Sequence, residues 1–201
     1  ACAPFRRLHV CDRNLEQIDP AKITTHNLLV DVCQAAKFEG ESIRGYYALY
    51  DTQYPSSGFT LCTMLARSFA DIGDIVRGRD LFLGYNETDR KEKKQLQQNL
   101  KNIFAKIYNE VTKTNGKAAK ERYGSDTTNY FQLREDWWNA NRETVWDAIT
   151  CEAQGFNYFR HTCNGGSPTK GKCRCEGANV NIVPTYFDYV PQYLRWFEEW
   201  A

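Results

Sequence analysis

TLCTMLARSFADIGDIVRG, from Thr60 to Gly78, is the stretch of sequence that decides the fold. Its apolar residues recur at intervals of three and four, which is the period of one face of an α-helix. Thr60 is a suitable N-cap residue, and Gly78 is suited to ending the helix. The apolar face comprises Leu61, Met64, Leu65, Ser68, Phe69, Ile72, Ile75 and Val76. The stretch therefore predicts an amphipathic helix.

The same helical period recurs along the rest of the chain. It predicts further helices over residues 21–38, 89–114, from Asp126 or Thr127 to about 148, and 184–200. No strand-length alternation competes with these helices. The sequence therefore predicts a mainly α-helical fold.

Glycine and proline indicate where the helices end. We expect Gly40 to end the helix of residues 21–38, and Asn115-Gly116 to end the helix of residues 89–114. Pro191 falls inside the last helical pattern, so that helix either begins near Pro191 or bends there. One side of this last predicted helix carries an aromatic stripe, formed by Tyr186, Tyr189, Val190, Tyr193, Leu194, Phe197 and Trp200.

The five tryptophans lie at helical spacing. We interpret them as core residues rather than as a platform for a ligand, because large aromatic side chains on amphipathic helices usually pack inward. They are Trp137, Trp138, Trp146, Trp196 and Trp200.

Residues 151–175, CEAQGFNYFRHTCNGGSPTKGKCRC, hold four of the eight cysteines. This segment is rich in glycine and nearly free of aliphatic residues, so burial of apolar surface cannot order it. Either disulfides or a metal ion must hold it in place. His161, Cys163, Cys173 and Cys175 are the candidate zinc ligands, but the His-x-Cys and Cys-x-Cys spacings are poor for chelation.

An even number of cysteines favours disulfides, and we predict no metal site. All eight are predicted to be disulfide-bonded: Cys2, Cys11, Cys33, Cys62, Cys151, Cys163, Cys173 and Cys175. Their connectivity stays open, since eight cysteines allow 105 pairings. One candidate pair is Cys33 with Cys62, because both lie on apolar helical faces.

Composition and motifs argue against several classes of function. The net charge is +1, so the whole chain is not a general binder of polyanions, and we expect no nucleic acid partner. No apolar run reaches the length of a membrane span. The histidines His9, His26 and His161 lie in no hydrolase or metalloprotease motif, and no phosphate-binding glycine loop is present. We predict no catalytic residues and no cofactor.

Acidic residues near arginines are predicted to form structural ion pairs. Asp71 and Asp74 lie one helical turn apart, with Arg67, Arg77 and Arg79 close in sequence. This pattern is more typical of ion pairs than of a catalytic carboxylate pair.

Positive charge is concentrated between residues 89 and 122, where ten basic and four acidic residues give a local charge of +6. Lys94 and Lys101 are seven residues apart and share one helical face. Lysines so arranged can bind a sulphated glycan through additive, salt-sensitive contacts. The candidate ligand-binding residues are Lys91, Lys93, Lys94 and Lys101, with Arg6 and Arg7 as a second basic spot. The alternative is a solubilising outer face.

Four segments together resemble one known family. They are LARSFADIGDIVRGRDLFLG at residues 65–84, CAPFRRLH at 2–9, YFQLREDWWNANRETVWDAITC at 130–151 and VPTYFDYVPQYLRWFEEW at 183–200. They are similar to the Duffy-binding-like domain of the Plasmodium falciparum erythrocyte membrane protein family, and especially to its alpha class. The resemblance covers nearly the whole chain.

The resemblance implies a disulfide-linked helical bundle of Duffy-binding-like type, with a long cysteine-rich loop before the last helix. It implies that residues 1–60 are the latter part of a first subdomain and that residues 61–201 are most of a helical second subdomain. A third subdomain would lie beyond this sequence, so we expect the chain to be a fragment of a larger protein.

The resemblance also implies function. It predicts an extracellular adhesion domain of a malaria variant surface antigen, displayed on the infected erythrocyte as part of a membrane-anchored protein. Its expected partners are erythrocyte or endothelial receptors, including heparan sulphate, complement receptor one or blood-group sugars, and host antibodies. Rosetting and antigenic variation are the expected roles, with no contact between this segment and the membrane. The alternative is a structural and antigenic module whose neighbouring domains bind the receptor.

Overall fold

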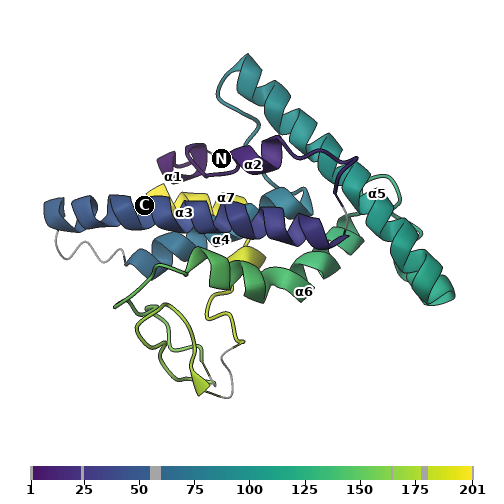
Figure 1. Cartoon of the computed structure of the whole chain (residues 1–201). Helices are drawn as coiled ribbons and strands as arrows, with labels where there is room; N and C mark the ends of the chain where they lie inside the picture. Colours follow the sequence, from purple (N-terminus) through teal and green to yellow (C-terminus); the bar gives the residue numbers. More distant parts are fainter. Residues whose placement is uncertain (1, 24, 55–59, 164, 178–180, 201) are drawn as a thin grey trace.

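The computed structural model describes residues 2–23, 25–54, 60–163, 165–177 and 181–200. The described chain is mainly helical, with the elements arranged as shown in Figure 1. They are α1 (Phe5–Leu8), α2 (Arg13–Glu16), α3 (Thr25–Gln53), α4 (Leu61–Arg77), α5 (Glu87–Tyr123), α6 (Phe131–Ile149) and α7 (Gln192–Trp200). The predicted fold class is confirmed.

Helix α4 lies at the centre and confirms the prediction for residues 60–78. It packs against α3, α6 and α7, and nearly all of its side chains are buried. The Thr60 side chain accepts a hydrogen bond from the Thr63 amide, and Gly78 ends the helix in the left-handed conformation with φ of 75°. Both ends of α4 therefore follow from local sequence chemistry.

Aromatic rings fill the space between α4 and α6. The ring of Phe69 lies 5.1 Å from that of Trp138 and 5.2 Å from that of Trp146. The indole N–H of Trp138 donates to Asp188, and that of Trp146 donates to the carbonyl of Cys173. The core interpretation is confirmed for four tryptophans, whereas Trp200 is 53% exposed.

Helix α3 corrects the expected helix end at Gly40. The helix begins at Thr25 and continues to Gln53, well past this glycine. Gly40 instead lies directly against α6, where an added Cβ would be 2.1 Å from the carbonyl oxygen of Ile149. The glycine permits the close approach of two helices, and it does not end one.

Helix α5 is interrupted where the sequence predicted its end. Gly116 has non-helical backbone angles, with φ of 32° and ψ of −102°, so α5 consists of two helical parts joined by a kink at Gly116, and the predicted helix end at Asn115-Gly116 is confirmed. The start of α6 corrects a predicted boundary. Helix α6 begins at Phe131 rather than at residue 126 or 127. Tyr130 is the N-cap residue, and the Asp126 carboxylate accepts a hydrogen bond from the amide of Phe131, the first residue of the helix.

The last helix begins directly after Pro191, which satisfies one of the two alternatives predicted for that proline. A 3₁₀ turn over Phe187–Tyr189 precedes it. The buried residues of α7 are Gln192, Arg195 and Trp196. Most of the predicted aromatic stripe faces outward, including Phe197 with 75% of its surface exposed. The face of α7 that packs on α4 is therefore partly polar.

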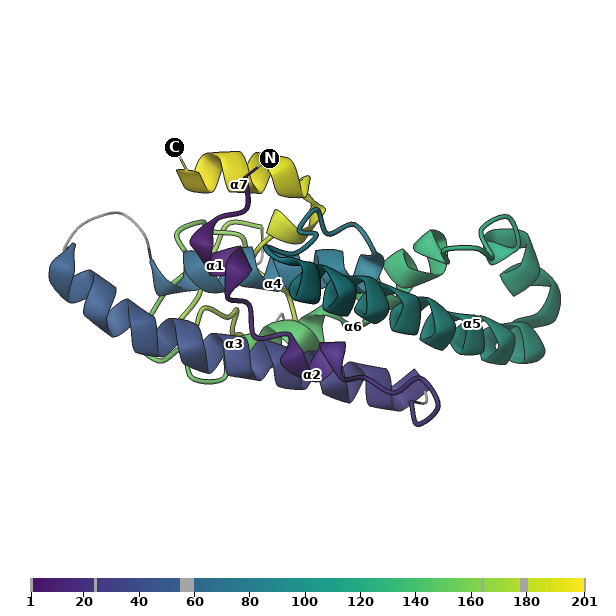
Figure 2. The same ribbon diagram turned by 90° about the horizontal axis from the view of Figure 1, so that it is seen from above.

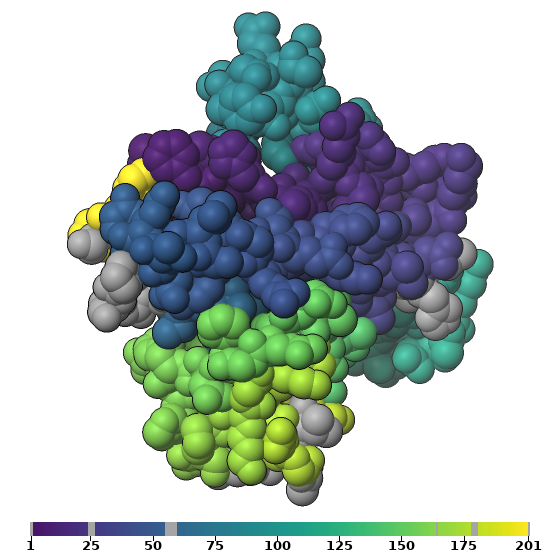
Figure 3. Space-filling view, turned by 60° about the vertical axis from the view of Figure 1, so that its left-hand side comes forward, coloured from purple at the N-terminus to yellow at the C-terminus, as the bar shows by residue number. Residues whose placement is uncertain are grey.

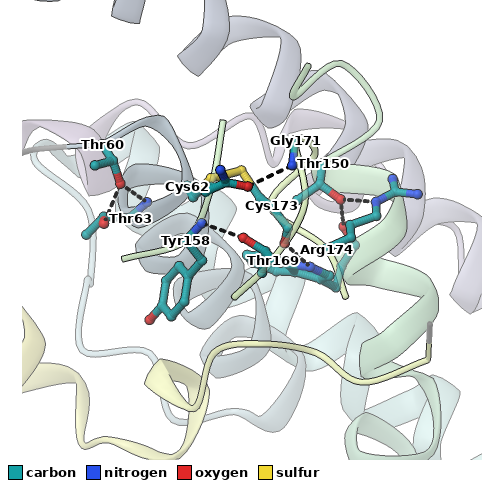
Figure 4. The surroundings of a disulfide bond; sticks show 11 residues. Thr60, Cys62, Thr63, Thr150, Tyr158, Thr169, Gly171, Cys173 and Arg174 are labelled. Carbon is teal, nitrogen blue, oxygen red and sulfur yellow. Dashed lines mark hydrogen bonds between the residues drawn. A yellow bond between two sulfur atoms is a disulfide. The ribbon is translucent and has the colours of Figure 1, made fainter. Parts of the chain in front are cut away.

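The cysteine-rich segment hangs below the helices between α6 and α7 (Figure 1) and is held by two disulfides. One joins Cys62, at the start of α4, to Cys173, and the other joins Cys163 to Cys175. Figure 4 shows Cys62–Cys173 beside a hydrogen bond from the Tyr158 amide to Thr169. The prediction that disulfides hold this segment is confirmed for Cys163, Cys173 and Cys175.

The proposed pairing of Cys33 with Cys62 is wrong, because Cys62 is bonded to Cys173. Cys2, Cys11, Cys33 and Cys151, which were also predicted to form disulfides, are free thiols in the structure. Burial raises the pKa of Cys33 to about 11, and burial together with Glu39 raises the pKa of Cys11 to about 11. Both thiols are therefore protonated at neutral pH.

The two ends of the described chain lie side by side (Figure 2). The indole N–H of Trp200 donates a hydrogen bond to the carbonyl oxygen of Cys2 at 3.0 Å. The ring of Phe5 lies 6.2 Å from that of Trp200. Segments α1 and α7, almost 200 residues apart in sequence, thus meet on the same side of α4.

Candidate functional site

The first turn of α5 fixes the position of the basic residues that follow it on the helix. Asn86 caps the helix, with its side-chain oxygen accepting a hydrogen bond from the Asp89 amide at 2.9 Å. The Asp89 carboxylate accepts one in return from the Tyr85 amide at 3.0 Å. This reciprocal arrangement holds the start of the helix, so the basic residues that follow have defined directions.

Three of the predicted lysines lie along the solvent-facing side of α5. Lys91 and Lys94 are exposed, and Lys101 is half-buried at the edge of the same side. Within the residues that the structure describes, none of the three has a carboxylate within ion-pair distance. Their charges are therefore available to a ligand.

Arg90 lies on the same side of α5 as these lysines, and it was not among the ligand-binding residues predicted from the sequence. It is exposed, and it also has no acidic partner in the described part of the chain. Arg90, Lys94 and Lys101 are four and seven residues apart, so they share one side of the helix over about 16 Å. That spacing was the sequence signal that could have identified Arg90. We call Arg90, Lys91, Lys94 and Lys101 the cationic edge of α5.

Lys93 is not available to a ligand, which corrects its predicted role. Its ammonium group lies 2.8 Å from Asp12 and 2.6 Å from Glu16, and its side chain is 12% exposed. Burial opposes the charge, but the two carboxylates outweigh burial and raise the pKa of Lys93. This lysine anchors α5 to α2.

Arg6 and Arg7 are likewise buried in ion pairs and do not form a basic spot on the surface. Arg6 lies 2.7 Å from Asp71 and 2.9 Å from Glu199, and Arg7 forms an ion pair with Asp80. Burial opposes the charge of Arg6, but the neighbouring carboxylates raise its pKa above the ordinary value. The two arginines join α1 to α4, to α7 and to the segment after α4.

Asp71 and Asp74 form structural ion pairs as predicted, but only one of the three arginines near them in sequence is a partner. Arg67 pairs with Glu198 and Arg79 with Glu135 instead. Arg77 pairs with Asp74 at 2.9 Å, as expected. Arg195 of α7 reaches both Asp71, at 2.7 Å, and Asp74, at 2.5 Å. Burial opposes ionisation of Asp71, but Arg6 and Arg195 hold its pKa at about 2. This network attaches the partly polar face of α7 to α4.

A groove runs beside the cationic edge. It has a volume of about 570 Å³ and lies between the irregular segment of residues 79–86 and the first turns of α5. Ile75, Phe82, Leu83 and Leu96 provide apolar walls, while Arg90 and Lys94 stand at its rim. Gly84 allows the segment of residues 79–86 to pass close to the first turn of α5, because an added Cβ would lie 2.6 Å from the Arg90 amide nitrogen.

Comparison with protein families identifies the chain. The family model described as the Duffy binding domain matches residues 1–195. The chain belongs to the Duffy binding domain family. This is a family of adhesion domains and not a family of enzymes. Comparison with curated proteins gave no match.

Solved structures of Duffy binding domains agree with this assignment. The NTS-DBL1(alpha-1) domain of the membrane protein PfEMP1 from the Plasmodium falciparum varO strain is 45% identical, with a TM-score of 0.78. The varO double domain of NTS-DBL1-alpha and CIDR-gamma is 46% identical, also with a TM-score of 0.78. The IT4var13 DBLbeta domain of PfEMP1 bound to ICAM-1 is 35% identical, with a TM-score of 0.71. Each of these matches covers 100% of the present chain.

The chain is much shorter than the Duffy binding proteins that it matches. It spans 43% of the NTS-DBL1(alpha-1) chain, 27% of the double-domain chain and 44% of the DBLbeta chain. Among the residues that the structure describes, no helix is long and apolar enough to cross a membrane.

Proposed function

We propose that this chain is part of an extracellular adhesion domain that binds receptors on host cells, and that the cationic edge of α5 contacts an anionic glycan such as heparan sulphate. The observation that carries the proposal is membership of the Duffy binding domain family, which includes a PfEMP1 domain bound to ICAM-1. The proposed location is the surface of the infected erythrocyte, within a larger membrane-anchored protein. Rosetting and antigenic variation are the biological roles that this proposal includes.

The electrostatics of α5 support glycan binding. Lys91, Lys94 and Lys101 carry charges that no neighbouring carboxylate neutralises in the described structure. Exposed ion pairs contribute about 0.2–1 kcal/mol each, so three of them contribute about 0.6–3 kcal/mol. A single patch of this strength binds weakly, and firm adhesion would need a polymeric ligand that engages several copies. A sulphated polysaccharide on a cell surface meets this requirement.

Retention on a heparin column across a salt gradient tests the proposal. The test variant combines Lys91→Glu, Lys94→Glu and Lys101→Glu. We expect it to elute at much lower salt than the unmodified chain, because it loses contacts that depend on ionic strength.

The matched control reverses three exposed lysines further along the same helix, Lys113, Lys117 and Lys120. It changes the net charge by the same amount. Equal loss of retention in the two variants would mean that net charge alone governs binding, and the cationic edge would then not be the site.

The second candidate function is a structural and antigenic module recognised by host antibodies, with the receptor contacted elsewhere. The short span of the chain relative to its matches favours it, because a receptor site built from the remaining part would be missing here. We further propose that residues 1–60 and 61–201 correspond to parts of the first and second subdomains. Binding of red cells by the complete domain but not by this chain would favour the structural module.

A further inference from the structure

The groove beside the cationic edge differs chemically from the edge itself. Its walls are apolar, and Leu83 is 73% exposed although it stands within a groove. The ring of Phe82 is fixed between two cations, with Arg7 at 4.8 Å and Lys93 at 5.9 Å from the ring centroid. The groove is therefore preformed, and its exposed apolar surface has no covering side chain in the described structure.

The charges inside the groove are neutralised, whereas those at its rim are not. Asp80 accepts hydrogen bonds from Arg7 and, at 2.8 Å, from Gln192. Lys93 is paired with two carboxylates of the α2 region. Arg90 and Lys94 remain as uncompensated cations at the mouth. An apolar floor below a positive rim selects an occupant that is apolar at its centre and acidic at its flanks.

We propose that this groove binds a short acidic segment of a protein partner, with one bulky apolar side chain in the groove and flanking carboxylates on Arg90 and Lys94. This goes beyond the glycan contact proposed above. A sulphated glycan satisfies cations but presents mostly hydroxyl and sulphate groups, so it gains little from Phe82 and Leu83. A peptide uses both the apolar walls and the charged rim.

The position of the groove makes it accessible to such a segment. In Figure 3 the start of α5 and the residues before it, in teal, project beyond the N-terminal segments in purple. The groove is open on its outer side, and its volume of about 570 Å³ is within the range of sites that hold a compact ligand. A protruding loop of a partner can therefore reach it.

Two blocked pentapeptides test the proposal by NMR titration of the ¹⁵N-labelled chain. One has the sequence Asp-Glu-Phe-Glu-Asp, and the other has serine in place of phenylalanine. We expect the phenylalanine peptide to shift the amide signals of residues 82–84 and 90–94 and to bind about tenfold more tightly than the serine peptide, because only its ring is removed from water.

Two leucine variants provide the matched comparison. Leu83→Ser should weaken binding of the phenylalanine peptide about threefold to tenfold. Leu49→Ser, which changes a leucine that is 67% exposed on α3, should leave it unchanged. Equal affinity of the two peptides, or no saturable shift up to about 5 mM peptide, would overturn the proposal.

A heparin tetrasaccharide distinguishes the groove from the glycan site. The proposal predicts that it shifts signals along the cationic edge while leaving the amides of residues 82–84 largely unchanged. Because both ligands contact Arg90 and Lys94, competition between them is expected. If the tetrasaccharide instead shifts the amide signals of residues 82–84 as strongly as the phenylalanine peptide does, with an affinity that Leu83→Ser does not alter, the groove is a glycan subsite and the peptide proposal is wrong.

Discussion

Replacing Gly40 by alanine tests the contact between α3 and α6, and Gly45→Ala is its matched control. Both glycines lie inside α3. A methyl group at Gly40 would lie 2.1 Å from the carbonyl oxygen of Ile149, whereas one at Gly45 would have no heavy atom within 4 Å. The two substitutions are chemically identical and differ in the space that receives the methyl group.

The magnitude follows from two opposing terms. Alanine is favoured over glycine in a helix interior by about 1 kcal/mol, so Gly45→Ala should stabilise the protein by up to that amount. At Gly40 the helices would have to separate by about 1.3 Å to restore ordinary contact. Overpacking of this kind costs about 1–3 kcal/mol or more, and it also disturbs the Ile149 backbone. We expect Gly40→Ala to be about 2 kcal/mol less stable than the unmodified protein.

Guanidinium-induced unfolding followed by far-UV circular dichroism, with the disulfides intact, measures both variants. The expected difference between them is about 3 kcal/mol, which corresponds to about 6–12 °C in melting temperature for a chain of this size. If Gly40→Ala is stabilised as much as Gly45→Ala, the close contact between α3 and α6 does not exist and the role assigned to Gly40 is wrong.

Three further predictions concern the disulfide, the acidic network and the cap. Replacing Cys62 and Cys173 with alanine should lower the free energy of unfolding by about 4–5 kcal/mol, since the bond closes a loop of 111 residues; an unchanged denaturation midpoint would contradict this. Because the folded pKa of Asp71 is about 2, below the unfolded value, its contribution of about 2 kcal/mol is present above pH 4 and lost between pH 4 and 2. Urea titrations across that range should show the loss, and a flat profile would contradict it. Asn86→Ala should cost about 1 kcal/mol, with amide exchange faster in the first turn of α5 than elsewhere in that helix.

The parts of the fold that could be predicted are those set by neighbours in sequence. Helix α4 has its cap, its apolar period and its terminating glycine within 19 residues, and its predicted limits are confirmed. The helix end predicted at Gly40 is wrong, because this glycine makes room for Ile149, which is more than 100 residues away in sequence. A glycine that permits close packing and a glycine that ends a helix are indistinguishable without knowledge of the partner.

In the candidate site, too, only the features set by neighbours in sequence could be predicted. Exposed Lys91 and Lys94 could be placed from helical spacing alone. Lys93, Arg6 and Arg7 could not, because their carboxylate partners belong to other segments that only the fold brings near. The groove was not predicted either, since its two walls are the residues before α5 and the first turns of α5, and their approach depends on the close return at residue 84.

The bond between Cys62 and Cys173 has a mechanical consequence. A tension that pulls on the chain from both sides of this pair passes directly from one sulfur to the other, so residues 63–172 carry none of the load. Those residues include most of α4 and all of α5 and α6, and would otherwise extend by about 370 Å when pulled straight. The cationic edge and the groove lie inside this shielded loop. The residues inside the loop therefore stay out of the path of an applied tension, even when the segments outside the loop are stretched.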